Sequence, residues 1–331
     1  MKTRTILQTM MNTADLHYQE KGIDDLFRLL EREEAGMSYY SPYSFLRDTE
    51  PGKLCRETFI APLRADITRG KLYAKLYDNE VGRTWIVWRE PAWDSEYFRR
   101  RIIKIEFIMA DHDDAAAAGS VIKRFAEEIA GNEGYVSVTI PCEDLFLIRV
   151  MSHTGFRLVE TRLNYYYDSF DTATVPADPV RLAVKKDIPA LKNVAMSMRN
   201  IFDRVHADPA FSPEIADAYL GTFIEESVKG FADIVMVPDI SGVRPFGFLA
   251  ADYPVEVMGH RIAKLVLAAV DNSEYRGWLS KLLTAVIYQL KMKNTDILTT
   301  ITQASNRPAI RTWEKAGFKL GFVTHVYTYS R

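Results

Sequence analysis

The sequence predicts an α/β (α+β) protein built from two similar domains in tandem, and two observations carry this prediction. The chain has 331 residues, more than an average single domain. Aligned with itself so that Ile148 falls on Ile310, it shows seven identities in twenty positions, as expected of a duplicated structural unit. The matching segments are Ile148–Leu158 with Ile310–Leu320, continued by Tyr165 with Tyr327 and Tyr167 with Tyr329.

Each copy predicts the same local elements, namely an amphipathic helix, a short helix and a strand. Gly155 and Gly317 stop the short helices, because glycine readily takes the left-handed conformation in which many helices end. The aromatic and β-branched residues that follow favour a strand. The upstream helices have apolar stripes at helical spacing, typical of core packing: Val121, Ile122, Phe125 and Ile129 in the first copy, and Leu282, Leu283, Val286, Ile287 and Leu290 in the second.

The domain boundary is predicted from a change in composition. Residues 168–179 are largely polar and contain two prolines, which is typical of a linker. We therefore expect an N-terminal domain at residues 1–170 and a C-terminal domain at residues 180–331. The segment before about position 80 repeats nothing and includes one clear helix, at residues 24–35. The sequence assigns no function to that segment.

Composition narrows the class of protein. Charged residues make up 26% of the chain, apolar residues 47%, and the formal net charge is −2, so the composition is that of a globular protein without the basic clusters that bind nucleic acid. No apolar run approaches the roughly 20 residues needed to cross a bilayer. Met1–Gln8 lacks a signal-peptide core, and Cys55 and Cys142 form neither a disulfide framework nor a metal motif. We expect a cytoplasmic protein without metal or membrane partners, and the oligomeric state stays open.

A glycine-containing loop follows the apolar stretch 265–270 and opens a predicted helix. Its sequence is Tyr275-Arg276-Gly277-Trp278-Leu279-Ser280. Backbone N–H groups at a helix N-terminus point outward and the helix dipole is positive there, so this position suits an anionic group. Glycine allows the anion to approach the backbone closely.

A second segment joins the predicted strand near residue 300 to the short helix that Gly317 ends. It reads Asn306-Arg307-Pro308-Ala309, continues through Trp313, and closes with Gly317-Phe318. Asn306 stands where a helix N-cap is expected. An asparagine there can equally hold a ligand, and the sequence leaves both roles open.

These two segments, together with the order strand, helices, hairpin, helix, strand, helix and strand from Val180 onward, resemble the GNAT superfamily of N-acetyltransferases. The family's loop is (Gln or Arg)-x-x-Gly-x-(Gly or Ala), and its later motif is Asn-x-x-Ala before a helix and Gly-Phe. The resemblance implies two domains that each have a mixed central sheet flanked by helices, with acetyl-CoA as co-substrate. The implied cofactor-binding residues are Ala268, Ala269, Val270, Arg276, Gly277, Trp278, Leu279, Asn306, Ala309 and Trp313.

Two positions depart from the family pattern. Leu279 stands where the loop motif has its first glycine. Trp313 stands where many members place a tyrosine that protonates the departing thiolate, and an indole cannot act as that acid. Catalytic candidates are therefore sought elsewhere: Tyr275 or Tyr327 as the acid, and Glu225 as the group that takes the proton of the amine by way of water.

The N-terminal copy is predicted to be degenerate. The alignment of the two copies places Asp114 at the position of Arg276, within Asp111-His112-Asp113-Asp114, and Asp144 at that of Asn306. Carboxylates oppose a pyrophosphate by about 1 kcal/mol or more each at near-surface dielectric. We therefore expect no CoA in this copy, whose acidic loop is a solvated surface feature.

The acceptor is suggested by one further resemblance. Trp93-Asp94-Ser95-Glu96-Tyr97-Phe98 and Asp208-Pro209-Ala210-Phe211 are similar to segments of dTDP-fucosamine acetyltransferase-like enzymes, which acetylate a nucleotide-linked amino sugar. The resemblance thus implies a small-molecule amine acceptor, with a peptide or aminoacyl acceptor as an alternative. A third hypothesis is a GNAT-fold protein that binds a ligand or partner without catalysis.

Overall fold

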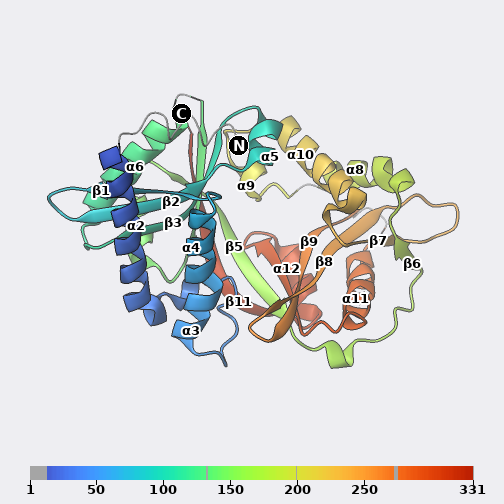
Figure 1. Cartoon of the computed structure of the whole chain (residues 1–331). Helices are drawn as coiled ribbons and strands as arrows, with labels where there is room; N and C mark the ends of the chain where they lie inside the picture. Colours follow the sequence, from blue (N-terminus) through green and yellow to red (C-terminus); the bar gives the residue numbers. More distant parts are fainter. Residues whose placement is uncertain (1–12, 132, 199, 272–274, 331) are drawn as a thin grey trace. The chain divides into compact units, whose positions relative to one another are not determined.

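The computed structural model describes residues 13–131, 133–198, 200–271 and 275–330 (Figure 1). Met1–Gln8, which entered the localisation prediction, lies outside these residues. Contacts divide the chain into two units, one that runs up to Arg157 and also takes the chain from Tyr327 on, and one formed by Leu158–Val326. Within the described ranges, no helix has both the length and the apolarity that membrane crossing requires.

The first unit has a sheet in the order β1-β2-β3-β4, with the end of β11 beside β4. Pairing is antiparallel from β1 to β3, and β3 and β4 run parallel. Its strands are β1 Tyr73–Asp78, β2 Arg83–Arg89, β3 Ile102–Ala110 and β4 Tyr135–Pro141. Its helical segments are α2 Thr13–Glu33, η1 Glu34–Tyr40, α3 Pro51–Cys55, η2 Arg56–Ile60, α4 Ala61–Thr68, α5 Ala92–Phe98, α6 Ala115–Ala130 and α7 Leu145–Met151.

Two apolar clusters cover the faces of this sheet. One joins α6 and α7 to the strands through the predicted stripe, including Val121, Ile122 and Phe125. The other joins α2, η1, η2 and α4 to the opposite face, where Trp85 and Phe107 are buried. The helical segments that precede β1 therefore cover one face of the sheet. They belong to the segment before about position 80, which has no counterpart in the second repeat. The helix expected at 24–35 begins earlier, at Thr13, and Gly36 lies inside the following 3₁₀ segment.

The second unit has a sheet in the order β11-β5-β10-β9-β8-β7-β6. Only β9 and β10 are parallel among the pairs whose register is known, so the sheet is mixed. Its strands are β5 Arg157–Tyr167, β6 Val180–Leu182, β7 Ile234–Pro238, β8 Gly247–Val257, β9 His260–Val270, β10 Ile297–Gln303 and β11 Lys319–Ser330. Its helical segments are η3 Phe170–Thr172, η4 Lys185–Asp187, α8 Ile188–Ser197, α9 Arg204–Ala207, α10 Pro213–Glu226, η5 Ser227–Phe231, α11 Trp278–Lys291 and α12 Arg307–Lys315.

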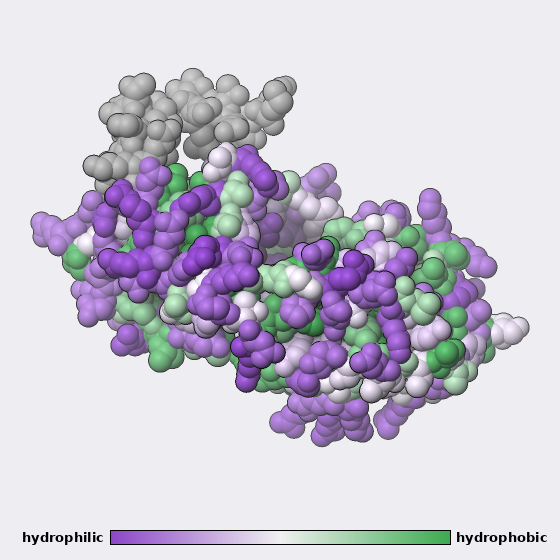
Figure 2. Space-filling model, turned by 60° about the horizontal axis from the view of Figure 1, so that its bottom comes forward, coloured by the Kyte–Doolittle hydropathy of each residue, from purple (hydrophilic) through white to green (hydrophobic). Residues whose placement is uncertain are grey.

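Helices again lie on both faces of the second sheet, and Figure 1 shows α8 and α10 on the side of β8 and β9 opposite to α11. The predicted stripe of α11, with Leu282, Leu283 and Val286, packs on one face. Leu191 of α8 and Ile224 of α10 pack on the other, against Phe248 and Ala250 of β8. The predicted class, a mixed central sheet flanked by helices, is confirmed. Hydrophilic side chains predominate on the molecular face in Figure 2.

The two units repeat one order of elements. The series β2, β3, α6, β4, α7, β5 corresponds to β8, β9, α11, β10, α12, β11. The strand β5 ends the first series in the chain, yet it pairs antiparallel with β10 in the second unit, with Arg162 opposite Gln303. The expected N-terminal domain, residues 1–170, includes β5, whereas contacts assign Leu158–Val326 to the second unit. The expected C-terminal domain, residues 180–331, therefore lacks a strand that the second unit contains. A boundary between independently folding domains stays a prediction.

Candidate functional site

The candidate site lies where two parallel strands of the second unit diverge. Pairing between β9 and β10 covers only residues 262–264 and 297–299. Beyond Lys264, β9 stays paired with β8 on its other side, so its edge toward β10 has no strand partner. Backbone N–H and C=O groups strongly favour hydrogen bonds, and an unpaired strand edge can bind an extended ligand.

A cavity of about 390 Å³ opens at this divergence. It is lined by Leu265–Ala269 of β9 and Thr300–Gln303 of β10, with residues of α8, α9 and α10 on one side. Its volume lies within the range of small-molecule sites, about 300–1,000 Å³. Six of the ten predicted cofactor residues line it: Ala268, Ala269, Leu279, Asn306, Ala309 and Trp313.

The other four predicted cofactor residues lie next to the cavity without lining it. Val270 ends β9, and Trp278 is a buried core residue at the start of α11. Gly277 is the N-cap of α11 with φ 89°, and a Cβ on it would meet open space. Arg276 is exposed beside it. The α11 N-terminus thus presents a left-handed glycine and a basic residue, as the anion-binding hypothesis requires.

Asn306 serves the helix cap and also lines the cavity. Its Oδ1 accepts a hydrogen bond of 3.3 Å from the backbone N–H of Ala309, which caps α12. Within the described part of the chain, no acceptor is found for its Nδ2 group. The two roles that the sequence left open are therefore compatible, because the cap uses only the oxygen of the side chain.

Trp313 brings a hydrogen-bond donor to the same region. Its side chain is 4% exposed and packs against Phe318, with ring centroids 5.6 Å apart. Among the described residues, its buried indole Nε1 has no hydrogen-bond partner. Because Trp313 also lines the cavity, this donor is available to an acceptor that a ligand supplies.

A polar network lies at the β5 side of the cavity. Glu160 is 1% exposed at its side chain, and its Oε1 accepts a hydrogen bond of 2.6 Å from Gln303 Nε2. Its Oε2 accepts from Arg162 Nε at 2.8 Å and lies 2.7 Å from Arg162 Nη2. Asn200 Nδ2 donates to Gln303 Oε1. All four residues line the cavity, and a carboxylate buried this deeply requires such partners.

A histidine and two carboxylates lie on the helical side of the cavity. His206 Nδ1 is 2.7 Å from Asp203 Oδ2, and His206 Nε2 is 3.1 Å from Asp217 Oδ1. The His206 side chain is only 4% exposed. Both ring nitrogens of His206 therefore face carboxylates of the protein. The group orders α9 and the start of α10 around the cavity.

The three catalytic candidates lie outside the cavity lining. Tyr275 stacks on Phe246, with ring centroids 3.5 Å apart. Tyr327 packs against the apolar cluster of the first unit that contains α6. Glu225 pairs with Lys192 at 2.5 Å and Lys229 at 2.8 Å, and hydrogen bonds from these two lysines lower its pKa to about 2. The structure brings none of the three together.

The first unit repeats the divergence with different chemistry. β3 and β4 pair only over residues 102–105 and 135–138, and a cavity of about 640 Å³ follows. Asp144, at the position of Asn306, accepts hydrogen bonds from Leu147 N at 2.8 Å and from the Tyr40 hydroxyl at 2.5 Å. Burial raises the pKa of Tyr40, and Asp144 raises it further.

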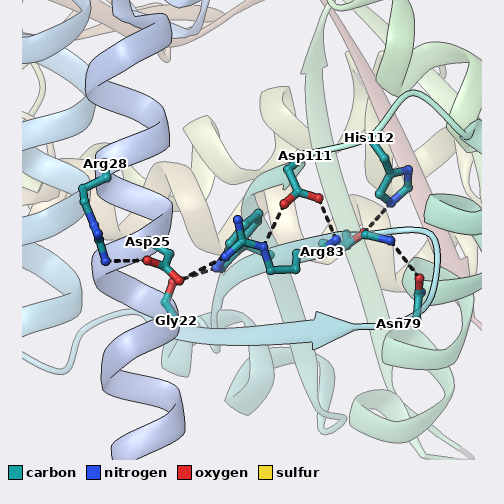
Figure 3. A network of polar contacts seen from close by, with 10 residues as sticks. Gly22, Asp25, Arg28, Asn79, Arg83, Asp111 and His112 are labelled. Atoms are coloured by element: carbon teal, nitrogen blue, oxygen red, sulfur yellow. Dashed lines mark hydrogen bonds and ion pairs between the residues drawn. The ribbon is translucent and has the colours of Figure 1, made fainter.

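The acidic loop of the first unit holds its own structure together (Figure 3). Asp111 forms a 2.8 Å ion pair with Arg83, which also reaches Asp25 of α2 at 3.0 Å. Asp114 caps α6 by accepting from Ala117 N at 2.9 Å. Among the described residues, four acidic ones line this cavity, against one arginine, Arg32, and one histidine, His112; the acidic residues are Glu33, Asp111, Asp113 and Asp144. Anionic phosphates would meet repulsion there.

Sequence reasoning missed the network of Glu160, Arg162, Gln303 and Asn200, and also missed Lys264 of β9. Alternation along β10 could have shown Gln303 on the face opposite to buried Thr300 and Thr302. No local signal marks Glu160 and Arg162, because their meeting with Gln303 depends on the pairing of β5 with β10. In the part of the chain that the structure describes, no group of three metal-ligating side chains is found.

No family model matches the chain, and neither does any curated protein. Solved structures with similar folds include a GCN5-related N-acetyltransferase from Sphaerobacter thermophilus, at 15% identity and TM-score 0.46, covering 78% of this chain and 76% of that one. A tandem GNAT protein from the clavulanic acid biosynthesis pathway has 14% identity and TM-score 0.46, with 78% and 83% covered. A GCN5-related N-acetyltransferase from Kribbella flavida has 14% identity and TM-score 0.46, with 81% and 93% covered.

Proposed function

We propose that the second unit is an N-acetyltransferase of the GNAT type, which moves an acetyl group from acetyl-CoA to an amine. The observation that carries the proposal is the cavity at the divergence of β9 and β10, lined by six of the residues that the sequence motifs predicted to hold CoA. The first unit has the same divergence but an acidic lining, so it serves as a scaffold without CoA.

The residues present fit acetyl-CoA at three points. The α11 N-terminus, with Gly277 and Arg276, suits the pyrophosphate. The unpaired edge of β9 at Leu265–Val270 suits the amide groups of an extended arm. The Nδ2 group of Asn306 and the unpartnered Nε1 of Trp313 are donors for its polar atoms. Acetyl-CoA supplies the thioester that carries the acetyl group.

The reaction forms one bond and breaks one. The amine nitrogen bonds to the carbonyl carbon, the carbon–sulfur bond breaks, and the proton lost by the amine is balanced by the proton gained by the thiolate. Backbone groups of Ala268 and Ala269 orient the carbonyl, and the cavity holds the amine against it. The thiolate takes its proton from water, because Trp313 is no acid and both Tyr275 and Tyr327 lie outside the cavity lining.

The acceptor that the sequence resemblance favours is a nucleotide-linked amino sugar, with a peptide or aminoacyl group as the alternative. Calorimetric titration with acetyl-CoA tests the donor, and mass spectrometry of reactions with amine panels tests the transfer. Binding in the micromolar range with acetylated product supports the proposal. Absence of binding contradicts it.

A second candidate function is ligand binding without catalysis. It is favoured by one observation, that Tyr275, Tyr327 and Glu225 all lie outside the cavity lining. The two functions differ in one result. A non-catalytic protein would bind acetyl-CoA or another ligand and yield no acetylated amine from any acceptor, whereas the transferase yields product.

A further inference from the structure

Arg162 uses only one edge of its guanidinium in the protein. Its Nε and Nη2 both contact Glu160 Oε2, at 2.8 and 2.7 Å. Within the described residues, no acceptor is found for Nη1. The side chain is 29% exposed, and the residue lines the cavity. The outer edge, formed by Nη1 and the second hydrogen of Nη2, therefore has two parallel N–H donors without an acceptor in the described part of the protein.

The fixed orientation of this edge follows from the network behind it. Asn200 donates to Gln303, Gln303 donates to Glu160, and Glu160 holds Arg162 by two contacts to one oxygen. Glu160 is 1% exposed at its side chain, so the anchor is firmly held. A guanidinium that is oriented in advance loses little entropy when it binds a planar oxyanion through two hydrogen bonds.

A second cation lines the same cavity from β9, which is separated from β5 by β10. This residue, Lys264, makes no direct hydrogen bond or ion pair with the described residues, although Asp252 of β8 lies opposite it and interacts with it electrostatically. Among the described lining residues, apart from His206, three are basic and two are acidic. The acids are already engaged, Glu160 by Arg162 and Asp203 by His206, so the lining has an excess of positive charge. The basic members are Arg162, Arg204 and Lys264, and the acidic members are Glu160 and Asp203.

We propose that the outer edge of Arg162 is a recognition site for an oxyanion on the acceptor, in a cavity to which Lys264 adds positive charge, so that the preferred acceptor is an amine that also carries a carboxylate or a phosphate. The inference rests on the proposed function and adds to it the chemical class of the acceptor. Both oxyanions accept the paired donors of a guanidinium, and two arms of one experiment distinguish them. The site includes a strand, β5, that the first repeat supplies in the chain.

The experiment compares matched amines in turnover with acetyl-CoA. The carboxylate arm uses L-phenylalanine against phenethylamine, and the phosphate arm uses O-phosphoethanolamine against ethanolamine. The wild-type protein is expected to acetylate at least one anionic amine with kcat/KM about tenfold or more above that of its neutral partner, the usual gain from a charge-assisted hydrogen-bonded pair. The arm that shows the gain identifies the oxyanion.

Substitutions test whether Arg162 and Lys264 cause the preference for anionic amines. Arg162→Lys keeps a charge near Glu160 but removes the paired donors, and Lys264→Ala leaves the Glu160 network untouched. Arg162→Lys is expected to raise the KM for the preferred anionic amine about tenfold, and Lys264→Ala by a smaller factor, with kcat, the KM for acetyl-CoA and turnover of the neutral amine unchanged. Arg244→Ala removes an equal charge from an exposed residue outside the cavity lining and is expected to change none of these.

A purely structural role for Arg162 would give a different pattern. Loss of the fold would lower turnover of neutral and anionic amines together and would lower the melting temperature in Arg162→Lys but not in Lys264→Ala. The inference is overturned if anionic amines gain nothing over neutral ones, including the case in which no amine reacts, or if the gain survives both substitutions. Turnover and calorimetry together separate the two failures: acetylation of amines without anion preference refutes this inference alone, whereas absence of acetyl-CoA binding, or binding without acetylation of any amine, also refutes the proposed function.

Discussion

Gln303 Nε2 donates a 2.6 Å hydrogen bond to Oε1 of the buried carboxylate of Glu160. The two residues are 143 positions apart, and they meet because β5 pairs with β10. The site of the second repeat therefore includes side chains from the strand that ends the first repeat. The strand β5 thus ends the first repeat along the chain and lies beside the candidate site of the second repeat.

Loss of the Glu160 carboxylate is expected to destabilise the protein. Glu160→Ala leaves Arg162 and Gln303 without their acceptor, and breaking one side of a buried pair costs about 3–5 kcal/mol. Chemical unfolding in urea measures the change. The control is Asp168→Ala, which removes an exposed partner of Lys319 and should cost about 1 kcal/mol or less. Equal effects of the two substitutions would contradict the role given to Glu160.

Truncation tests the place of β5. A fragment of residues 180–331 lacks the strand that pairs with β10, and it exposes the edge of β10 together with that of β11. Unpaired strand edges promote aggregation. We expect this fragment to be insoluble or unfolded by circular dichroism, and a fragment that begins at residue 156 to fold. A folded 180–331 fragment with native stability would show that β5 is dispensable.

Gly277 offers a test of the α11 N-terminus. Its φ of 89° is unfavourable for most side chains, although Asn tolerates this region better than most. Gly277→Asn is expected to retain acetyl-CoA binding within a few-fold. Gly277→Glu places a carboxylate at the proposed pyrophosphate position, where repulsion is expected to lower the affinity at least tenfold. Calorimetry on both folded variants measures their affinity for acetyl-CoA. Equal affinities would show that this loop does not bind the pyrophosphate.

Two buried indoles form a matched pair for a second test of the site. Among the described residues, Trp313 and Trp88 both have a buried Nε1 without a hydrogen-bond partner, but only Trp313 lines the cavity of the second unit. Trp313→Phe is expected to weaken acetyl-CoA binding about fivefold to tenfold, the loss of one hydrogen bond worth about 1 kcal/mol. Trp88→Phe should leave the affinity unchanged. The same loss in both variants, or in neither, would exclude a contact from Trp313.

Glu225 provides a test of pH dependence. Hydrogen bonds from Lys192 and Lys229 lower its pKa from 4.5 to about 2. A carboxyl group with a lowered pKa stabilises the fold above its unfolded pKa, and this stabilisation disappears as the pH falls from about 4.5 toward 2. The difference in melting temperature between the wild type and Glu225→Gln should therefore shrink over this range. A difference that stays constant from pH 7 to pH 2 would contradict the shift.

The same carboxylate is a weak base at neutral pH. Because its pKa is about 2, Glu225 has little tendency to take a proton from an ammonium group. Glu225→Gln is accordingly expected to keep kcat within about twofold between pH 6 and pH 9. A large loss of kcat, with acetyl-CoA binding intact, would indicate that Glu225 takes part in catalysis.

Local patterns in the sequence could predict a large part of the fold and of the proposed acetyl-CoA site. The hairpin of β8 and β9, the helix stop at Gly317 and the cap at Asn306 each follow from a few neighbouring residues. The apolar stripe of α11 likewise shows which face is buried.

The polar residues on the β5 and helical sides of the cavity could not be predicted as a group, because their meeting depends on long-range contacts. Glu160 and Arg162 look like any exposed charges on a strand until β5 is placed beside β10, with Arg162 opposite Gln303. The grouping of Asp203 and His206 likewise depends on a contact of His206 with Asp217, which lies on another helix. The strand register that joins such segments is specified by the packing of the whole sheet, and no local pattern records it.

The central claim is that the cavity at the divergence of β9 and β10 binds acetyl-CoA, and isothermal titration calorimetry of the full chain tests it most directly. We predict one binding site per chain with a dissociation constant in the micromolar range, and an affinity at least tenfold lower in Gly277→Glu. No heat of binding in the wild-type protein, or a binding site that Gly277→Glu leaves unchanged, would contradict the claim.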